Sequence, residues 1–171
     1  MKKHIALILT IFLFALTAVA QVEKQTDALL KAETLLRVET ENGKSFELKA
    51  TDLIKLPRRE IKGKTHDGVE AMFAGVELHE VLKLAGVKYG KEAKGSYLNS
   101  FLVVEVADNY LVVFAMSELE ADLTDKVILL ADTRDGKPLS KEEGSLRLVV
   151  PDEKKQARWV RQVIILRVKK I

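Results

Sequence analysis

The stretch F-A-G-V-E-L-H-E-V-L-K-L-A-G-V, residues 73–87, decides the fold because the spacing of its apolar residues changes inside it. From Val76 onward the apolar side chains recur at helical spacing, with charged residues between them. These apolar residues are Leu78, Val81, Leu82 and Ala85. Gly86 stands where the glycine that ends a helix belongs. The stretch therefore predicts an amphipathic helix that packs on a sheet.

Short strands are predicted before this helix, at residues 60–64 and 69–73, and T-H-D-G at 65–68 is a turn by composition. Further upstream, alternation of apolar and polar residues over 36–41 indicates a half-buried strand. Asn42-Gly43 predicts a hairpin turn to a partner strand at 45–48, because both residues tolerate positive φ.

A short helix is predicted between these two groups of strands. Thr51 and Asp52 can cap it, and Pro57 ends it after Leu56.

The C-terminal half returns to strands, and a short helical segment is predicted near 154–159. The predicted strands span 100–107, 110–115, 126–132, 146–151 and 163–168. Asp108-Asn109 and R-D-G-K-P at 134–138 are the turns. The segment 126–132 is apolar enough to be buried on both faces. The fold class is α+β, with a mainly antiparallel or mixed β-sheet and short helices.

The N-terminus predicts export. A basic start, an apolar run over 5–17 and small residues at Ala18 and Ala20 are typical of a signal peptide cleaved after Ala20. A buried N-terminal helix and an uncleaved anchor are the alternatives. We expect residues 1–20 as the signal peptide, 21–33 as a polar lead-in and 34–171 as a single domain, with a periplasmic or secreted location and no stable membrane anchor after cleavage.

Composition excludes several functional classes. The 171 residues include no cysteine, which excludes lipid attachment through cysteine, disulfides and all thiolate chemistry. Loss of Lys2 and Lys3 with the signal peptide leaves 26 basic against 25 acidic residues, so a nucleic-acid surface is not expected.

Two histidine motifs were weighed as metal sites. His66-Asp67 has ligand chemistry, but Asp-Gly after a polar residue is ordinary turn chemistry and no second histidine stands at ligand spacing. His79-Glu80 begins like a zinc-protease motif, yet Lys83 occupies the place of its second histidine, which predicts a solvated helix face. We expect no metal site, and no residue stands out as a catalytic nucleophile.

Five strings resemble, in order, those of the molybdopterin-binding oxidoreductase domain of the sulfite oxidase family. They are residues 73–87, V-A-D-N-Y at 106–110, L-L-A-D-T-R-D-G-K-P-L at 129–139, G-S-L-R-L-V-V-P at 144–151 and A-R-W-V-R-Q-V at 157–163. The resemblance covers about residues 45–171 and implies a sheet-rich α+β fold that, in active members, holds a molybdenum cofactor with basic side chains and backbone amides. If it holds, we expect the strands within 100–115 and 126–150 to share one sheet.

The resemblance also assigns cofactor-binding residues. Arg147 and Arg158 match basic positions of the family strings, and Asp108 and Tyr110 match its "DGY" string, with Asn109 in place of glycine. Read from the residues alone, Arg147 is either an anion-binding side chain in a cleft or a solvent-facing or salt-bridged arginine. Trp159 is better explained as a core anchor, with arginine stacking as the second interpretation.

The departures from the family concern the redox site. Active members bind molybdenum through a cysteine sulfur, and this chain has no cysteine. Glu142 and Glu143 stand where members often carry a histidine, and two carboxylates there would repel a cofactor phosphate.

Three hypotheses follow from the sequence. The first is a family member without redox activity and without an expected cofactor, which binds a small anionic ligand or a protein partner. The second is an oxidoreductase component that holds molybdopterin through Arg147 and Arg158 without a cysteine ligand. The third is an unrelated secreted sheet domain that packs on a partner. The oligomeric state is not predicted.

Overall fold

The computed structural model describes residues 33–171. The predicted signal peptide and residues 21–32 of the predicted lead-in lie outside the described residues. Within the described part, none of the helices has the length and apolar character needed to cross a membrane.

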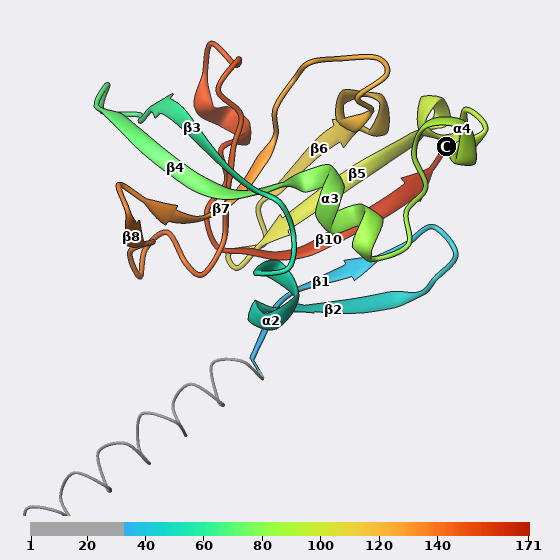
Figure 1. Cartoon of the computed structure of the whole chain (residues 1–171), viewed down its shortest axis with the longest axis horizontal. Coiled ribbons are helices and arrows are strands. Elements are labelled where there is room, and N and C mark those ends of the chain that lie inside the picture. Colours follow the sequence, from blue (N-terminus) through green and yellow to red (C-terminus); the bar gives the residue numbers. More distant parts are fainter. Residues whose placement is uncertain (1–32) are drawn as a thin grey trace, which may run out of the picture. The chain divides into compact units, whose positions relative to one another are not determined.

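One sheet contains the first and last strands of the fold, in the order β2-β1-β10-β5-β6 (Figure 1). Its strands are β1 (Thr34–Glu39), β2 (Ser45–Lys49), β5 (Ser100–Val106), β6 (Leu111–Ala115) and β10 (Val163–Lys170). β1 and β10 are parallel, and the other neighbours are antiparallel. Both predicted hairpins are confirmed, with Gly43 at φ 73° and Asn109 at φ 66° in their turns.

The second sheet has the order β3-β4-β7-β8, and its fifth strand β9 also pairs with β7. Its strands are β3 (Arg58–Lys64), β4 (Glu70–Glu77), β7 (Leu129–Arg134), β8 (Lys137–Pro138) and β9 (Arg147–Val149). All pairs are antiparallel. The burial predicted for 126–132 is confirmed over its second half, where Leu129, Leu130 and Ala131 are fully buried. The fold is α+β, as predicted.

The expectation that strands of 100–115 and 126–150 share one sheet is wrong. β5 and β6 belong to the first sheet, whereas β7, β8 and β9 belong to the second. The reason is that the last strand, β10, inserts between β1 and β5, while β7 pairs with β4. The order of strands along the chain does not determine these long-range pairings.

Short helices connect the strands. They are α2 (Ala50–Leu53), α3 (Leu78–Leu84), α4 (Gly90–Ala93) and the 3-10 helices η1 (Ser96–Asn99), η2 (Met116–Leu119) and η3 (Gln156–Arg158). The helix predicted within 73–87 is α3; Gly86 follows it at φ 92°, as the sequence indicated. α2 is shorter than predicted, and the carboxylate of Asp52 accepts a hydrogen bond from the backbone N–H of Lys49 at its start.

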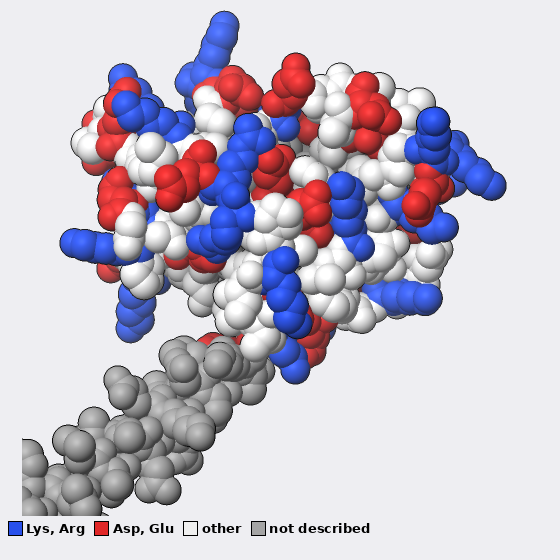
Figure 2. All heavy atoms as spheres, viewed as in Figure 1, with Lys and Arg blue, Asp and Glu red and all other residues white. Residues whose placement is uncertain are grey.

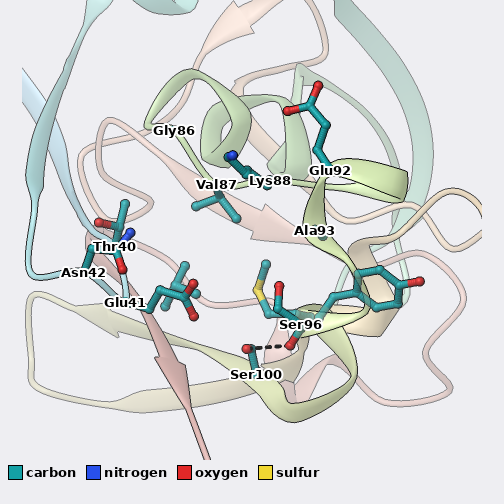
Figure 3. A pocket seen from close by; sticks show the side chains of 13 residues that line it. Thr40, Glu41, Asn42, Gly86, Val87, Lys88, Glu92, Ala93, Ser96 and Ser100 are labelled. Carbon is teal, nitrogen blue, oxygen red and sulfur yellow. Dashed lines mark hydrogen bonds between the residues drawn. The ribbon is translucent and has the colours of Figure 1, made fainter.

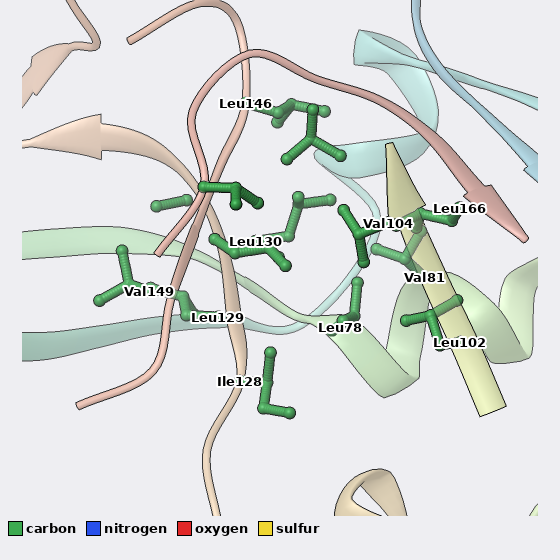
Figure 4. Close-up of a cluster of buried hydrophobic side chains, with 14 of the residues drawn as sticks. Leu78, Val81, Leu102, Val104, Ile128, Leu129, Leu130, Leu146, Val149 and Leu166 are labelled. Carbon is green, nitrogen blue, oxygen red and sulfur yellow. The ribbon is translucent and has the colours of Figure 1, made fainter. Parts of the chain in front are cut away.

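The core is one cluster formed by α3 and both sheets (Figure 4). Leu78 and Val81 of α3 are fully buried in it, with Leu102 of β5, Leu130 of β7 and Leu166 of β10. The apolar face of α3 therefore packs in the one core that contains residues of both sheets.

β4 and β7 lie very close together at Gly75, where the register of the pairing shifts. A Cβ atom on Gly75 would lie 2.6 Å from the Cα of Ala131 and would also collide with the backbone oxygen of Leu130. Both obstacles are backbone atoms of the buried first half of β7, so no side-chain rotation can relieve the clash. Only glycine fits here.

We predict that Gly75→Ala lowers the free energy of unfolding by about 3 kcal/mol, because the added methyl group forces β4 away from β7. The measurement is equilibrium denaturation in urea. Ala74→Ser, one residue earlier at a partly exposed position, is the matched control. Equal stability of the two variants would contradict this account of the β4–β7 contact.

Candidate functional site

Arg147 lies in β9 with only 5% of its surface exposed. Its Nη1 is 2.5 Å from Oε1 of Glu143, and its guanidinium carbon lies 4.9 Å from the centre of the Phe73 ring. Leu146 and Leu148 on either side are fully buried as well, so β9 is covered on both faces. The salt-bridged interpretation of Arg147 is confirmed and the solvent-facing one is wrong.

The environment of this pair explains its electrostatics. Burial lowers the pKa of Arg147, and the hydrogen bond to Glu143 opposes that shift. Burial raises the pKa of Glu143. The hydrogen bonds that its carboxylate accepts from Arg147 and from the backbone N–H of Ser140 outweigh burial and leave its pKa below the ordinary value. Nε of Arg147 is buried without a hydrogen-bond partner.

Arg158 ends η3 and is surrounded by carboxylates. Its Nη1 and Nη2 each lie 3.1 Å from one oxygen of Glu118, and its Nε lies 2.7 Å from Glu153. The guanidinium also stacks over the Phe114 ring, with 4.2 Å from its carbon to the ring centre. Lys126 completes the group at 2.5 Å from Glu118. We call these four charged residues the Arg158 cluster.

Glu118 has the most displaced carboxyl pKa in this group. Partial burial would raise it, but hydrogen bonds from Arg158, Lys126 and the backbone N–H of Ala115 outweigh burial and lower the pKa to about 2. Glu118 is therefore ionised at neutral pH and offsets the charge of Arg158.

Trp159 follows Arg158 and is 7% exposed. Its Nε1 donates a hydrogen bond of 2.8 Å to the carbonyl of Val150, and its ring meets Phe73 edge-on with 6.1 Å between centroids. The prediction that Trp159 is a core anchor is confirmed.

Asp108 and Tyr110 lie in the exposed turn between β5 and β6. The Asp108 carboxylate accepts a hydrogen bond of 3.0 Å from the backbone N–H of Tyr110. Both residues line an open pocket of about 500 Å³ together with Glu142 and Arg161. Neither Arg147 nor Arg158 lines this pocket, so the four predicted binding residues are not brought together in it.

A smaller pocket of about 240 Å³ lies at another place in the fold (Figure 3). Residues from the β1–β2 turn, the segment after α3 and η1 line it, with Met116 and Val168 among its apolar side chains. Glu41, Lys88 and Glu92 are its charged residues. None of the four predicted cofactor-binding residues lines it.

The two histidines within residues 33–171 occupy different environments. His66 is exposed in its turn, and Asp67 accepts a hydrogen bond from the Thr65 hydroxyl, which lowers the Asp67 pKa. His79 is less solvated than predicted, because it lies between Glu77 and Glu80 and against the Tyr89 ring. Within residues 33–171 no three His, Cys, Asp or Glu side chains are grouped to hold a metal ion.

Opposite charges alternate over the face seen in Figure 2, where Lys and Arg side chains lie among Asp and Glu side chains.

The carboxylate partners of Arg158 were missed by sequence reasoning. Glu118 is 40 residues away along the chain, and nothing in the local sequence links them.

The sequence of residues 22–170 matches the family model described as the oxidoreductase molybdopterin binding domain. The chain belongs to this family. This match confirms the family resemblance. The strands of 100–115 and 126–150 lie in different sheets, so the expectation that they share one sheet does not test whether the chain belongs to the family. No curated protein matches the chain.

The family fold is also found in a solved structure, the sulfane dehydrogenase SoxCD from Paracoccus pantotrophus. The two chains are similar with a TM-score of 0.61 and 23% sequence identity. The match covers 78% of this chain but only 37% of that one. At this identity the likeness establishes the fold alone.

We predict that Glu143→Gln lowers the free energy of unfolding by about 3 kcal/mol, because it leaves the buried Arg147 cation without a counter-charge. The adjacent, exposed Glu142→Gln is the control and should change stability by less than about 0.5 kcal/mol. Denaturation in urea at neutral pH measures both. Equal effects of the two substitutions would show that the Arg147–Glu143 pair does not stabilise the fold.

The low pKa of Glu118 predicts an acid-sensitive contribution to stability. Its pKa in the folded protein is about 2 against an ordinary value of 4.5, so the stabilisation is fully present above 4.5 and is lost as the pH falls towards 2. Glu118→Gln should therefore be less stable than the native chain by about 2 kcal/mol at pH 6, with the two curves converging at low pH. Parallel curves from pH 6 to pH 2, measured by urea denaturation, would refute the prediction.

Proposed function

We propose that this chain is an exported member of the molybdopterin-binding domain family that carries out no redox chemistry and acts as a binding module. One observation carries the proposal. In a chain without cysteine, both arginines that the family resemblance assigns to the cofactor are neutralised by carboxylates of the protein itself.

The residues present do not fit a molybdenum cofactor. The resemblance implies a thiolate that binds the metal and free cations that bind the phosphate. Here the thiolate is absent. The guanidinium of Arg147 is paired with Glu143, and that of Arg158 is paired with Glu118 and Glu153. A cofactor phosphate would have to displace these carboxylates or lie beside them, and like charges in a buried region repel strongly.

Of the two ligand classes expected from the sequence, a protein partner has more support than a small anion. The basic residues expected to bind an anion are already paired. By contrast, Leu111 and Val113 of β6 leave half of their surface in contact with solvent. Exposed apolar side chains on a sheet are typical of protein contacts.

A second candidate function rests on one atom. Nε of Arg147 is buried and donates no hydrogen bond, so it is an unused donor of the type that binds an oxyanion. This donor is the observation on which a second candidate, molybdopterin held through Arg147 and Arg158 without a cysteine ligand, would rest. The experiment below distinguishes the two functions.

The protein is purified from the exported fraction of cells that make the cofactor, and an intact mass matching residues 21–171 verifies the proposed processing. Molybdenum is measured by mass spectrometry and pterin by fluorescence after oxidation. A family member that has the cysteine ligand, purified from the same cells, shows that cofactor was available. We expect no molybdenum or pterin above background.

Stoichiometric cofactor in the native chain would overturn the proposal. Arg147→Met would then test the second candidate, because that candidate requires the variant to lose the cofactor. Glu142→Gln is the control for this step, since it changes a nearby charge without touching Arg147.

A further inference from the structure

The smaller pocket, of about 240 Å³, has an apolar wall built from several parts of the fold (Figure 3). Ala93 of α4, Met116 of η2 and Val168 of β10 line it, and each is at most 7% exposed. Val87, in the segment after α3, lines it as well and packs against the core. The pocket therefore exists only in the folded arrangement of these elements. We call it the hairpin pocket, because the β1–β2 turn lines one side of it.

Two hydroxyl groups of the hairpin pocket have already donated their protons inside the protein. Ser100 is 8% exposed, and its Oγ donates a hydrogen bond of 2.8 Å to the carbonyl of Ser96 (Figure 3). Oγ1 of Thr40 donates a hydrogen bond of 3.2 Å to the carbonyl of Lys44. A hydroxyl has one proton and two lone pairs, so both oxygens offer a ligand only lone pairs. A ligand that meets them must therefore be a hydrogen-bond donor.

The charged residues of the hairpin pocket are not used by the protein itself. Glu41, Lys88 and Glu92 line the pocket and are exposed, and within residues 33–171 none of them forms an ion pair. Lys169 and Lys170 line a neighbouring groove with Glu41, but they form no ion pair with it and do not line the hairpin pocket. Unlike the paired arginines described above, these groups are free to act on a ligand. Two carboxylates against one ammonium leave the pocket with an excess of negative charge.

We propose that the hairpin pocket binds a small ammonium compound with an apolar body. An ammonium group has three N–H donors and no acceptor, which matches both the acceptor oxygens and the excess negative charge. The apolar body lies against Met116 and Val168, where it is removed from water. Asn42, Ser96 and Tyr97 can each donate and accept, so they do not discriminate between ligands. The inference goes beyond the proposed function and does not rest on it.

The volume of the hairpin pocket limits the size of the ligand. A water molecule takes up roughly 30 Å³ of liquid, so 240 Å³ corresponds to about eight non-hydrogen atoms. A ligand this small makes few contacts, and its Kd is on the order of 1 mM. Hexylamine, an ammonium group on a linear chain of carbon atoms, fits this size and is the first probe.

The test compares hexylamine with hexanol, hexanoate and norleucine, which have the same number of carbon atoms and different charged groups. Binding to the protein purified from the exported fraction is followed in amide NMR spectra, which also locate it. Hexylamine should shift the amides of Val87, Ser96 and Ser100 and bind about tenfold more tightly than hexanoate, because the anion meets two carboxylates. Norleucine adds a carboxylate for Lys88. Whichever of hexylamine and norleucine binds more tightly identifies the source of the ammonium group as a free amine or an amino acid.

Two charge variants should move the affinity for hexylamine in opposite directions. Glu41→Gln removes an attracting charge and should weaken binding about threefold, whereas Lys88→Met removes a repelling charge and should strengthen it by about the same factor. Glu60→Gln and Lys137→Met are the matched controls, because both residues lie in the second sheet and do not line the pocket. All four positions are exposed, so the substitutions leave the core intact. The two controls should leave the affinity unchanged.

Three results would overturn the inference. The first is hexanoate or hexanol binding as tightly as hexylamine, which would show that the pocket does not recognise an ammonium group. The second is Glu41→Gln or Lys88→Met behaving like its control. The third is hexylamine shifting amides elsewhere in the protein and none around the hairpin pocket. Cofactor content is measured independently, so failure of this inference leaves the proposed function separately testable.

Discussion

A guanidinium that is almost completely removed from water needs a negative charge beside it, and the Arg147–Glu143 pair meets this need. Arg147 of this pair lies in β9 and packs against Phe73 of β4, and Phe73 in turn contacts Trp159. The packing of three separate chain segments therefore depends on one buried charge being neutralised. In a family whose fold is associated with an anionic cofactor, this chain neutralises the charge with its own carboxylate.

The Arg158 cluster also neutralises an arginine, here at the surface, and in addition it bonds to the backbone at the edge of β6. Glu118 and Arg158 form a bidentate ion pair, and each also makes a hydrogen bond to the backbone of β6. The residue that the family resemblance connects with cofactor binding thus protects the edge of a sheet here. With its edge occupied in this way, β6 leaves Leu111 and Val113 as its solvent-exposed apolar side chains.

The sequence predicted local features well and long-range pairing poorly. The turns at Gly43 and Asn109 and the helix end at Gly86 were predicted because each depends on a residue that accepts positive φ. Glu143 is interpreted from the sequence as repelling an anion, and its pairing with Arg147 is not predicted, because it depends on how the turn at 140–144 folds back on β9. The insertion of β10 between β1 and β5 and the contact of Glu118 with Arg158 depend on tertiary packing, which no local pattern encodes.

The internal ion pairs also make it harder for an external anion to bind to Arg147 and Arg158. A carboxylate attached to the same fold is always present at its arginine, whereas a free phosphate must be drawn from solution and ordered. If a phosphate displaced Glu143 from Arg147 while Glu143 stayed buried, its carboxylate would lose its counter-charge, at a cost of several kcal/mol. An apolar contact on β6 carries no such cost, because Leu111 and Val113 lose only water when they are covered. The physical chemistry of the described residues therefore favours a protein surface over a small anion as what this scaffold binds.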